Sequence, residues 1–244
     1  MKITSTILAV LIGSCAFAQL KFPAVSSHSE IEQKVGLTEF EVEYNRPNVS
    51  ERKVFGKLVP YGEVWRTGAN ENTVIKFNQP IKVNGKELAA GEYALYSIPN
   101  KDEWDVIFYK DTKNWGNPKE WKESNVALKV KAVATKSMNN KVETFEIRFT
   151  NVTQQKADLV LAWDNVNVVL NIETNTVSSV LKMIGEQLNE NSSARDFYNS
   201  ANFYYSNKLD RNQALKWVNI ALEKDAKAPD YYKELKEKLE KEKY

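Results

Sequence analysis

The feature that most constrains the fold is a change in hydrophobic periodicity close to residue 174. Before this point, apolar and polar residues alternate in short runs such as 38–44, which is typical of half-buried strands. After it, apolar residues recur at helical spacing, beginning with 177–188. The sequence therefore predicts a mainly β domain over residues 19–174 and an all-α appendix of about four helices over residues 175–244.

The turns between the β runs narrow the architecture further. Asn84-Gly85 separates runs 81–83 and 86–88, and Asn-Gly is a strong hairpin signal because both turn residues adopt positive φ. Run 103–110 carries apolar side chains on both faces, which indicates a central strand. With about eight or nine strands and no helix between them, an antiparallel β-sandwich or open barrel is expected.

Residues 21–34 are polar and rich in serine, and they are predicted to form an arm that leads into the β domain. His28, the single histidine, lies on this arm. A catalytic histidine needs a rigid orienting partner, so an exposed and inert role is expected for His28.

The appendix contains recognisable helix starts. Ser193 to Asp196 has the pattern of a capping box, and residues 194–225 resemble one tetratricopeptide repeat. Repeats of this kind need several units to bury their apolar faces. A single unit is therefore expected to dock on the β domain, and it could also bind a protein partner.

The N-terminus has the form of a secretory signal peptide over residues 1–18. A positive start precedes the apolar run 3–12, and an A-x-A cleavage pattern at 16–18 predicts a mature chain that begins at Gln19. The alternative is a lipoprotein retained through Cys15. Either way the chain is predicted to be exported to the periplasm or the extracellular space, without a transmembrane segment, because the apolar run is too short to span a bilayer.

Composition excludes several classes of function. The formal net charge of +2 implies no strongly basic face, so nucleic acid is not an expected partner. With one histidine, and no cysteine after cleavage, zinc clusters of His and Cys are excluded. No nucleotide-binding loop or catalytic serine motif is found. We expect neither a metal nor a cofactor.

The stretch 44–73 is the best candidate for a site. It is too long and too apolar for an ordinary connection between strands, which spans about 2–6 residues. It contains Arg46, Arg52 and Arg66, whose planar guanidinium groups suit carboxylate, phosphate or sulfate. Its glycines let backbone N–H groups approach a ligand closely. The arginines are therefore predicted to line an anion site.

A structural alternative stays open for the same arginines. They could instead pair with Glu51, Glu63 and Glu71 and hold the long loop on the β domain, because buried arginines are commonly paired.

Aromatic and acidic residues extend the candidate site. Tyr61, Trp65 and Trp115 could stack on sugar rings or on a partner, or they could plug the end of the fold. Residues 70–72 offer oxygen atoms but lack the spaced acidic loop of a calcium site. Glu63 with Glu71 is a candidate carboxylate pair for glycoside hydrolysis, a mechanism that requires a fixed separation between the two.

The pattern RP-x4-R-x2-FG-x-LVPYG-x-VWRTGANE-x-T, which begins at Arg46, resembles the signature of a secreted bacterial family catalogued as domain of unknown function 2911. The resemblance continues through Gly85, through 88–99 and through 104–108, and it covers roughly residues 25–175. The family has no established reaction, so the resemblance implies no catalytic residues.

The sequence thus favours an exported, non-enzymatic binding or accessory protein for a small anionic or carbohydrate ligand. One alternative is a hydrolase of an envelope or polysaccharide substrate acting through Glu63 and Glu71. Another is a scaffold that binds proteins through its helical appendix. The candidate ligand-binding residues are Arg46, Arg52, Tyr61, Glu63, Trp65, Arg66, Asn70, Glu71 and Trp115.

Overall fold

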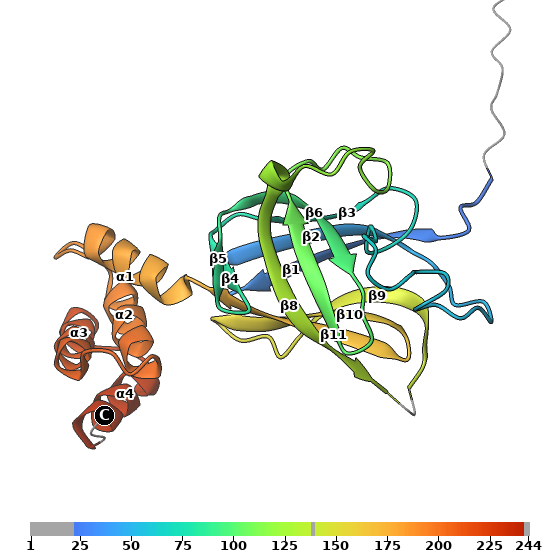
Figure 1. Ribbon diagram of the computed structural model, residues 1–244. Helices are drawn as coiled ribbons and strands as arrows, with labels where there is room; N and C mark the ends of the chain where they lie inside the picture. Colours follow the sequence, from blue (N-terminus) through green and yellow to red (C-terminus); the bar gives the residue numbers. More distant parts are fainter. Residues whose placement is uncertain (1–21, 138–139, 242–244) are drawn as a thin grey trace, which may run out of the picture.

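The computed structural model describes residues 22–137 and 140–241. The predicted signal peptide 1–18, with Cys15 and the expected mature start at Gln19, lies outside the described residues. Figure 1 shows a β-barrel with a group of helices beside one of its ends. Within the two described ranges, no helix is long and apolar enough to cross a membrane.

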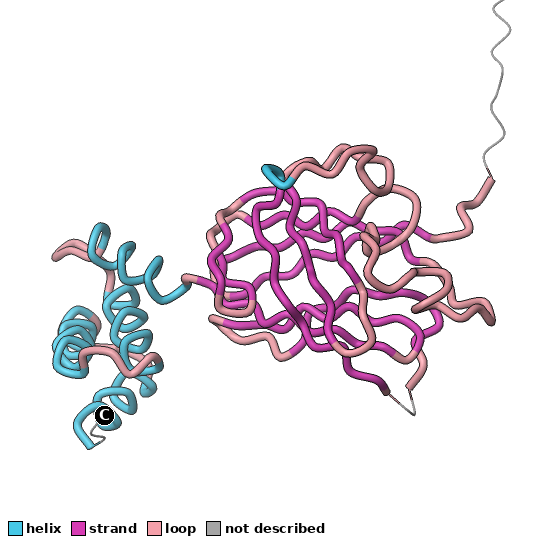
Figure 2. The backbone as a smooth tube through the Cα atoms, viewed as in Figure 1, coloured by secondary structure: helices cyan, strands magenta, loops and turns pink. Residues whose placement is uncertain are grey.

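The β domain confirms the predicted mainly β, antiparallel class. Its strands wrap around a common interior, whereas the helices that follow the last strand form a separate group (Figure 2). Over the described residues there are eleven strands: β1 (Ser27–Val35), β2 (Thr38–Arg46), β3 (Thr73–Phe77), β4 (Ile81–Val83), β5 (Lys86–Leu88), β6 (Gly91–Ile98), β7 (Glu103–Tyr109), β8 (Val126–Lys136), β9 (Val142–Thr150), β10 (Lys156–Asp164) and β11 (Val166–Thr174).

The strands form one nearly closed barrel, which decides between the two predicted architectures. The hydrogen-bonded order is β1-β2-β3-β6-β7-β8-β11-β10-β9, and the β4–β5 hairpin pairs with β11. The chain just after β2 bridges the remaining gap: the Val49 N–H donates to the Glu143 carbonyl at 2.8 Å, and the Phe145 N–H donates to the Pro47 carbonyl at 2.9 Å. These bonds leave β9 without an open edge at this position.

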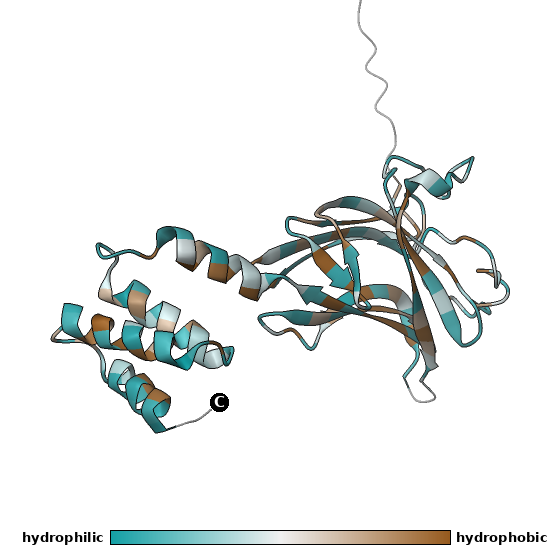
Figure 3. Ribbon diagram, turned by 60° about the vertical axis from the view of Figure 1, so that its left-hand side comes forward, coloured by the Kyte–Doolittle hydropathy of each residue, from teal (hydrophilic) through white to brown (hydrophobic). Residues whose placement is uncertain are grey.

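Alternate side chains along each strand point into the barrel, and these side chains form its core. Figure 3 shows hydrophilic and hydrophobic residues alternating along the strands. On β6 and β7, Leu95 and Phe108 belong to the main core, while Tyr96 and Tyr109 belong to a second apolar cluster. Both faces of β7 are therefore covered, as its two-sided apolar pattern predicts.

The predicted arm over residues 21–34 is wrong for most of its length. β1 pairs with β2 along its whole length, from Ser27 opposite Arg46 to Val35 opposite Thr38. His28 therefore lies on a strand. The alternation of β1 is hard to detect because Gln33 interrupts the inward-facing series between Ile31 and Val35.

The described part of the appendix contains four helices, as expected. The Ser193 hydroxyl accepts a hydrogen bond from the Asp196 N–H, and the Asp196 carboxylate accepts one from the Ser193 N–H, so the capping box is present. The helices are α1 (Thr176–Gln187), α2 (Ala194–Ser206), α3 (Arg211–Lys224) and α4 (Asp230–Lys241), and one 3-10 turn, η1 (Glu123–Asn125), precedes β8.

The expectation that the appendix buries its apolar faces on the β domain is wrong. Its two hydrophobic clusters consist of its own residues, centred on Ala201, Val218 and Tyr232. Stacked aromatic rings contribute to these clusters, and the ring centroids of Tyr198 and Tyr232 lie 4.1 Å apart. They bury apolar surface that a single repeat would otherwise leave exposed.

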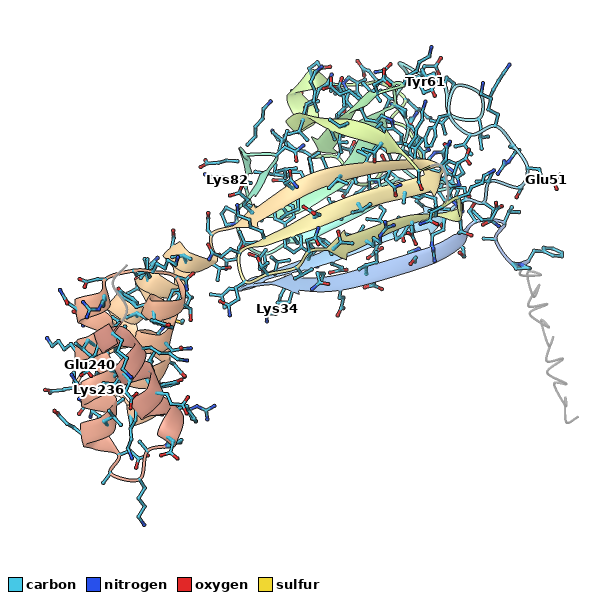
Figure 4. The ribbon with its side chains drawn as sticks, turned by 90° about the horizontal axis from the view of Figure 1, so that it is seen from below. Lys34, Glu51, Tyr61, Lys82, Lys236 and Glu240 are labelled. Carbon is cyan, nitrogen blue, oxygen red and sulfur yellow. The ribbon has the colours of Figure 1, made fainter. Side chains whose placement is uncertain are left out.

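The candidate stretch lies at the end of the barrel away from the helices. Figure 4 shows Glu51 and Tyr61 at this far end, and Lys34 and Lys82 close to the appendix. The predicted site and the appendix are therefore on opposite ends of the barrel.

Candidate functional site

Residues 47–72, the loop between β2 and β3, are anchored inside the barrel. Phe55 is buried, and its ring centroid lies 5.0 Å from that of Trp104 and 6.0 Å from that of Trp163. Burying an aromatic side chain of this size contributes about 1.5–3 kcal/mol. The loop therefore has a defined position despite its length.

Trp65 is the second anchor of this loop. Its backbone exchanges two hydrogen bonds with Ser97 of β6, at 2.8 and 2.9 Å. Its indole N–H donates to the Gly68 carbonyl at 2.9 Å, and its ring stacks on Trp163 with a centroid distance of 5.7 Å. Trp65 is thus a core residue that fixes the position of Arg66.

Arg66 connects two loops. Its Nη1 donates to the Asn70 carbonyl at 2.6 Å. The guanidinium lies against Gly116 in the connection between β7 and β8, where an added Cβ would stand 2.8 Å from Nη1. Gly116 has a φ of 76°, so both its conformation and its contact with Arg66 favour glycine.

The other two arginines also bind backbone carbonyls. Arg52 donates from Nε to the Val49 carbonyl at 3.0 Å and from Nη2 to the Asn48 carbonyl. Arg46 donates from Nε to the Phe145 carbonyl at 2.9 Å. The Arg46 bond holds the end of β2 against β9, and the Arg52 bonds fix the loop on itself.

The alternative in which carboxylates pair with these arginines is not observed. Among the described residues, no carboxylate oxygen lies within 4.0 Å of a nitrogen of Arg46, Arg52 or Arg66. Glu51 and Glu63 are exposed. The arginines keep their full positive charge beside neutral carbonyl groups.

Arg52 and Arg66 line one cavity, here called the arginine pocket. It has a volume of about 380 Å³, and it is also lined by Gly68, Asn70 and Trp115. Its lining includes no acidic side chain among the residues that the structure describes. The pocket is therefore positively charged and of a size to hold a small anion or an acidic group.

The indole of Trp163 is an unusual part of this lining. Trp163 is 2% exposed, and its Nε1 has no hydrogen-bond partner, which is true of no other buried side-chain nitrogen or oxygen in the described part of the chain. Leaving a buried donor unpaired costs about 1–3 kcal/mol. An unpaired buried donor calls for an explanation, and a water or ligand bound in the adjoining cavity is one that fits its position.

A second cavity, here called the polar pocket, lies on the other side of Asn70 and Trp115. It has a volume of about 770 Å³. Both pockets include Asn70 and Trp115 in their linings. The other polar side chains that line it are those of His28, Glu43, Asn45, Glu71, Asn72, Thr112, Lys113 and Asn114.

Hydrogen bonds fix part of the polar pocket. The buried Asn45 amide donates to Glu71 Oε2 at 3.1 Å, and its carbonyl oxygen accepts from the Asn70 amide at 3.3 Å. Asn72 donates to the Thr112 carbonyl at 3.2 Å. These bonds orient Asn70 and Glu71 and leave Asn70 Oδ1 and Glu71 Oε1 without partners in the described structure.

The structure thus divides the predicted site residues. Arg52, Trp65, Arg66, Asn70 and Trp115 line the arginine pocket, and Asn70, Glu71 and Trp115 line the polar pocket.

Arg46, Tyr61 and Glu63 line neither of the two pockets. Sequence reasoning missed two residues. Trp163 lies on β10, far along the chain from the candidate stretch, and Asn45 lies on β2, at the edge of that stretch. The unpaired indole that marks Trp163 is visible only in three dimensions.

Tyr96 supports the backbone of Gly116, next to Arg66, through its hydroxyl group. It is fully buried, and its hydroxyl donates to the Gly116 carbonyl at 3.0 Å. Burial, assisted by the negative charge of Asp111, raises the pKa of Tyr96 to about 12, and the positive charge of Arg66 works weakly in the opposite direction. Tyr96 is therefore neutral at physiological pH and serves as a support for residue 116.

A cluster of three glutamates beside the polar pocket brings carboxylate oxygens together. Glu30, Glu41 and Glu43 each place a carboxylate oxygen within 4.8 Å of the others, on the paired strands β1 and β2. Lys76 already donates to Glu41 at 3.1 Å. Exposed acidic groups of this kind are common without a metal, and this one defines no metal centre.

Taken together, the chain is a nearly closed antiparallel β-barrel protein with pockets at one end and a helical appendix at the other. The family model described as "Protein of unknown function (DUF2911)" matches residues 26–172, so the chain belongs to this family and the resemblance seen in the sequence is confirmed. No curated protein and no solved structure matches the chain.

Proposed function

We propose that this protein is an exported binding protein whose barrel holds a small anionic ligand in the arginine pocket. The observation that carries the proposal is that Arg52 and Arg66 line one cavity in which no described side chain is acidic. A guanidinium that keeps its charge and faces a cavity is a ready site for carboxylate, phosphate or sulfate.

The hydrogen bonds of the two arginines support a binding role beside a structural one. An arginine offers five N–H donors in a rigid fork. Arg66 uses only Nη1 within the described protein, and Arg52 uses only Nε and Nη2. The donors that remain can bind an anion while the carbonyl contacts hold each side chain in place.

Export is part of the proposal and rests on the N-terminal sequence. We expect a mature chain that starts at Gln19 and carries no lipid. The intact mass of the protein recovered from the periplasm or the medium tests this. An acylated chain that starts at Cys15 would contradict it.

Anion binding is tested by thermal unfolding in sulfate, phosphate or citrate against chloride at equal ionic strength. A ligand that binds only the folded state raises the unfolding midpoint, and at a hundred times its Kd it stabilises by about 2.7 kcal/mol. We expect at least one of these anions to raise the midpoint of the wild type, and Arg66→Gln to abolish that rise.

The matched control is Arg195→Gln, which removes the same charge from an exposed position on α2. It should keep the full response to the anion. No anion-dependent rise in the wild type, or an equal loss in both variants, would show that the pocket binds no anion. Each variant is compared with its own midpoint in chloride.

A further inference from the structure

The arginine pocket and the polar pocket meet at the same two residues. Asn70 and Trp115 belong to both linings. The side chain of Trp115 is 71% exposed, although it stands between two cavities. An exposed tryptophan in such a place offers a large apolar face to a ligand that spans both pockets.

The polar pocket has a different chemistry from its neighbour. Glu71 Oε1 and Asn70 Oδ1 are acceptor oxygens without partners in the described protein, and the network around Asn45 holds both side chains in position. Hydroxyl groups can donate to such oxygens. A second acidic group would instead meet the carboxylates of Glu43 and Glu71, which outnumber the single ammonium group of Lys113 in the lining of this pocket.

We propose, resting on the anion site above, that the ligand is an acidic saccharide. Its acid group binds Arg52 and Arg66, a sugar ring lies on Trp115, and hydroxyl groups of a neighbouring neutral sugar donate to Asn70 and Glu71. The charge changes sign from one pocket to the other, so the acid group has one preferred end.

The dimensions agree with a ligand of this length. The two cavities have volumes of about 380 and 770 Å³, so together they hold more than one sugar ring. The aromatic face at their junction suits the C–H face of a ring, and the fixed oxygens beyond it suit the hydroxyl groups. A simple anion fills only the first pocket.

The test uses aldobiouronic acids, which join one uronic acid to one neutral sugar. Binding of a glucuronate-containing and a galacturonate-containing example is measured by calorimetry at constant ionic strength. Their methyl esters, which lack the charge, and inorganic sulfate, which lacks the rings, are the comparison ligands. At least one of the two acids should bind tenfold or more tightly than both its own ester and sulfate.

Variants separate the two pockets. Trp115→Ala should weaken the preferred disaccharide about tenfold and leave sulfate unchanged, and Trp115→Phe should restore much of the loss because an aromatic face remains. Glu71→Gln keeps an acceptor oxygen, so it should weaken the disaccharide less than Glu71→Ala does. Arg66→Gln should weaken both the disaccharide and sulfate.

The outcomes distinguish this inference from the proposed function. If sulfate binds through Arg66 but neither acid binds more tightly than sulfate, the anion site stands and the saccharide assignment is wrong. A Trp115→Ala variant that weakens sulfate as much as the disaccharide also overturns the assignment. If sulfate and both acids all fail to bind the wild type, the anion site itself is wrong.

Discussion

Two loops build the candidate site, and they pack in different apolar clusters, one inside the barrel and one on its outer face. The loop over residues 47–72 sends Phe55 and Trp65 into the barrel core. The loop over residues 110–125 lies on the outer face of β6 and β7, where Trp121 packs against Tyr96 and Tyr109. Hydrogen bonds from Tyr96 to the Gly116 carbonyl and from Asn117 to the Val64 carbonyl, at 3.0 and 2.7 Å, also hold it.

The two loops are expected to contribute differently to the stability of the fold and to ligand binding. The first loop supplies both arginines of the pocket, and their positions depend on the core. The second loop supplies Trp115, whose ring is mostly in solvent. Changes to the buried aromatic residues of the first loop should therefore act mainly on the free energy of unfolding, whereas changes at Trp115 should act mainly on ligand affinity.

The largest effect is expected from Phe55→Ala. Removing a buried ring that contacts Trp65, Trp104 and Trp163 should lower the free energy of unfolding by about 3–5 kcal/mol, measured by urea unfolding. Leu58→Ala is the control, because Leu58 lies in the same loop but is exposed, and it should cost less than about 1 kcal/mol. Equal losses in the two variants would contradict the anchored loop.

The next effect is a loss of stability at alkaline pH. An unfolded tyrosine releases its proton near pH 10, whereas Tyr96 in the fold keeps it to about pH 12. Tyr96 therefore contributes to the free energy of unfolding in full below pH 10. This contribution, roughly 2–3 kcal/mol, is lost as the pH rises from 10 to 12.

Urea unfolding at pH 9 and pH 11 measures about half of this loss, roughly 1–1.5 kcal/mol, and Tyr96→Phe isolates it. Burial also raises the pKa of Tyr93, but wild type and variant share that contribution. Tyr96→Phe should be less stable than wild type at pH 9, by about 1 kcal/mol for its lost hydrogen bond, and should lose less stability between the two pH values. Parallel losses in both proteins would show that the raised pKa of Tyr96 does not cause the alkaline loss of stability.

A smaller effect separates Gly116 from Gly62. The two glycines have nearly the same φ, 76° and 77°, so alanine at either position should cost about 1–2 kcal/mol through the left-handed conformation. An added Cβ meets the Arg66 guanidinium at residue 116 and meets nothing within 4 Å at residue 62. Gly116→Ala should therefore lose the anion-dependent rise of the unfolding midpoint, while Gly62→Ala should keep it.

The smallest effect on stability is expected from Trp115→Ala, within about 0.5 kcal/mol of wild type in urea unfolding, because exposed side chains contribute little to the fold. A loss of more than 1 kcal/mol would show that the ring supports its own loop. In that case the contrast between the two loops would be wrong.

Sequence reasoning succeeded where the pattern is local. The two-sided apolar run at β7, the Asn84-Gly85 hairpin and the capping box at Ser193 were all predicted from residues close together in the chain, and all are present. β1 was missed because Gln33 interrupts its inward-facing series. Local signals of this kind carry no information about a strand whose apolar pattern is incomplete.

The site was predictable only in part. The candidate stretch contains the pocket arginines, and the sequence left open whether they line an anion site or pair with glutamates. In the structure Arg66 binds the Asn70 carbonyl and lies against Gly116. A backbone carbonyl has no sequence signature, and residue 116 is brought there by tertiary structure. The unpaired indole of Trp163 likewise depends on what surrounds it.

The passage from β11 into α1 has a mechanical consequence. Only Asn175 separates Thr174 from Thr176, and the Thr176 hydroxyl bonds the Thr174 hydroxyl at 2.9 Å while its side chain lies against Gly36. The appendix is therefore joined to the barrel by a one-residue connection, which the hydrogen bond and the contact with Gly36 hold in place. A force applied to the appendix would therefore act first on β11, which is hydrogen-bonded to β4 at its end next to α1 and to β10 along its length.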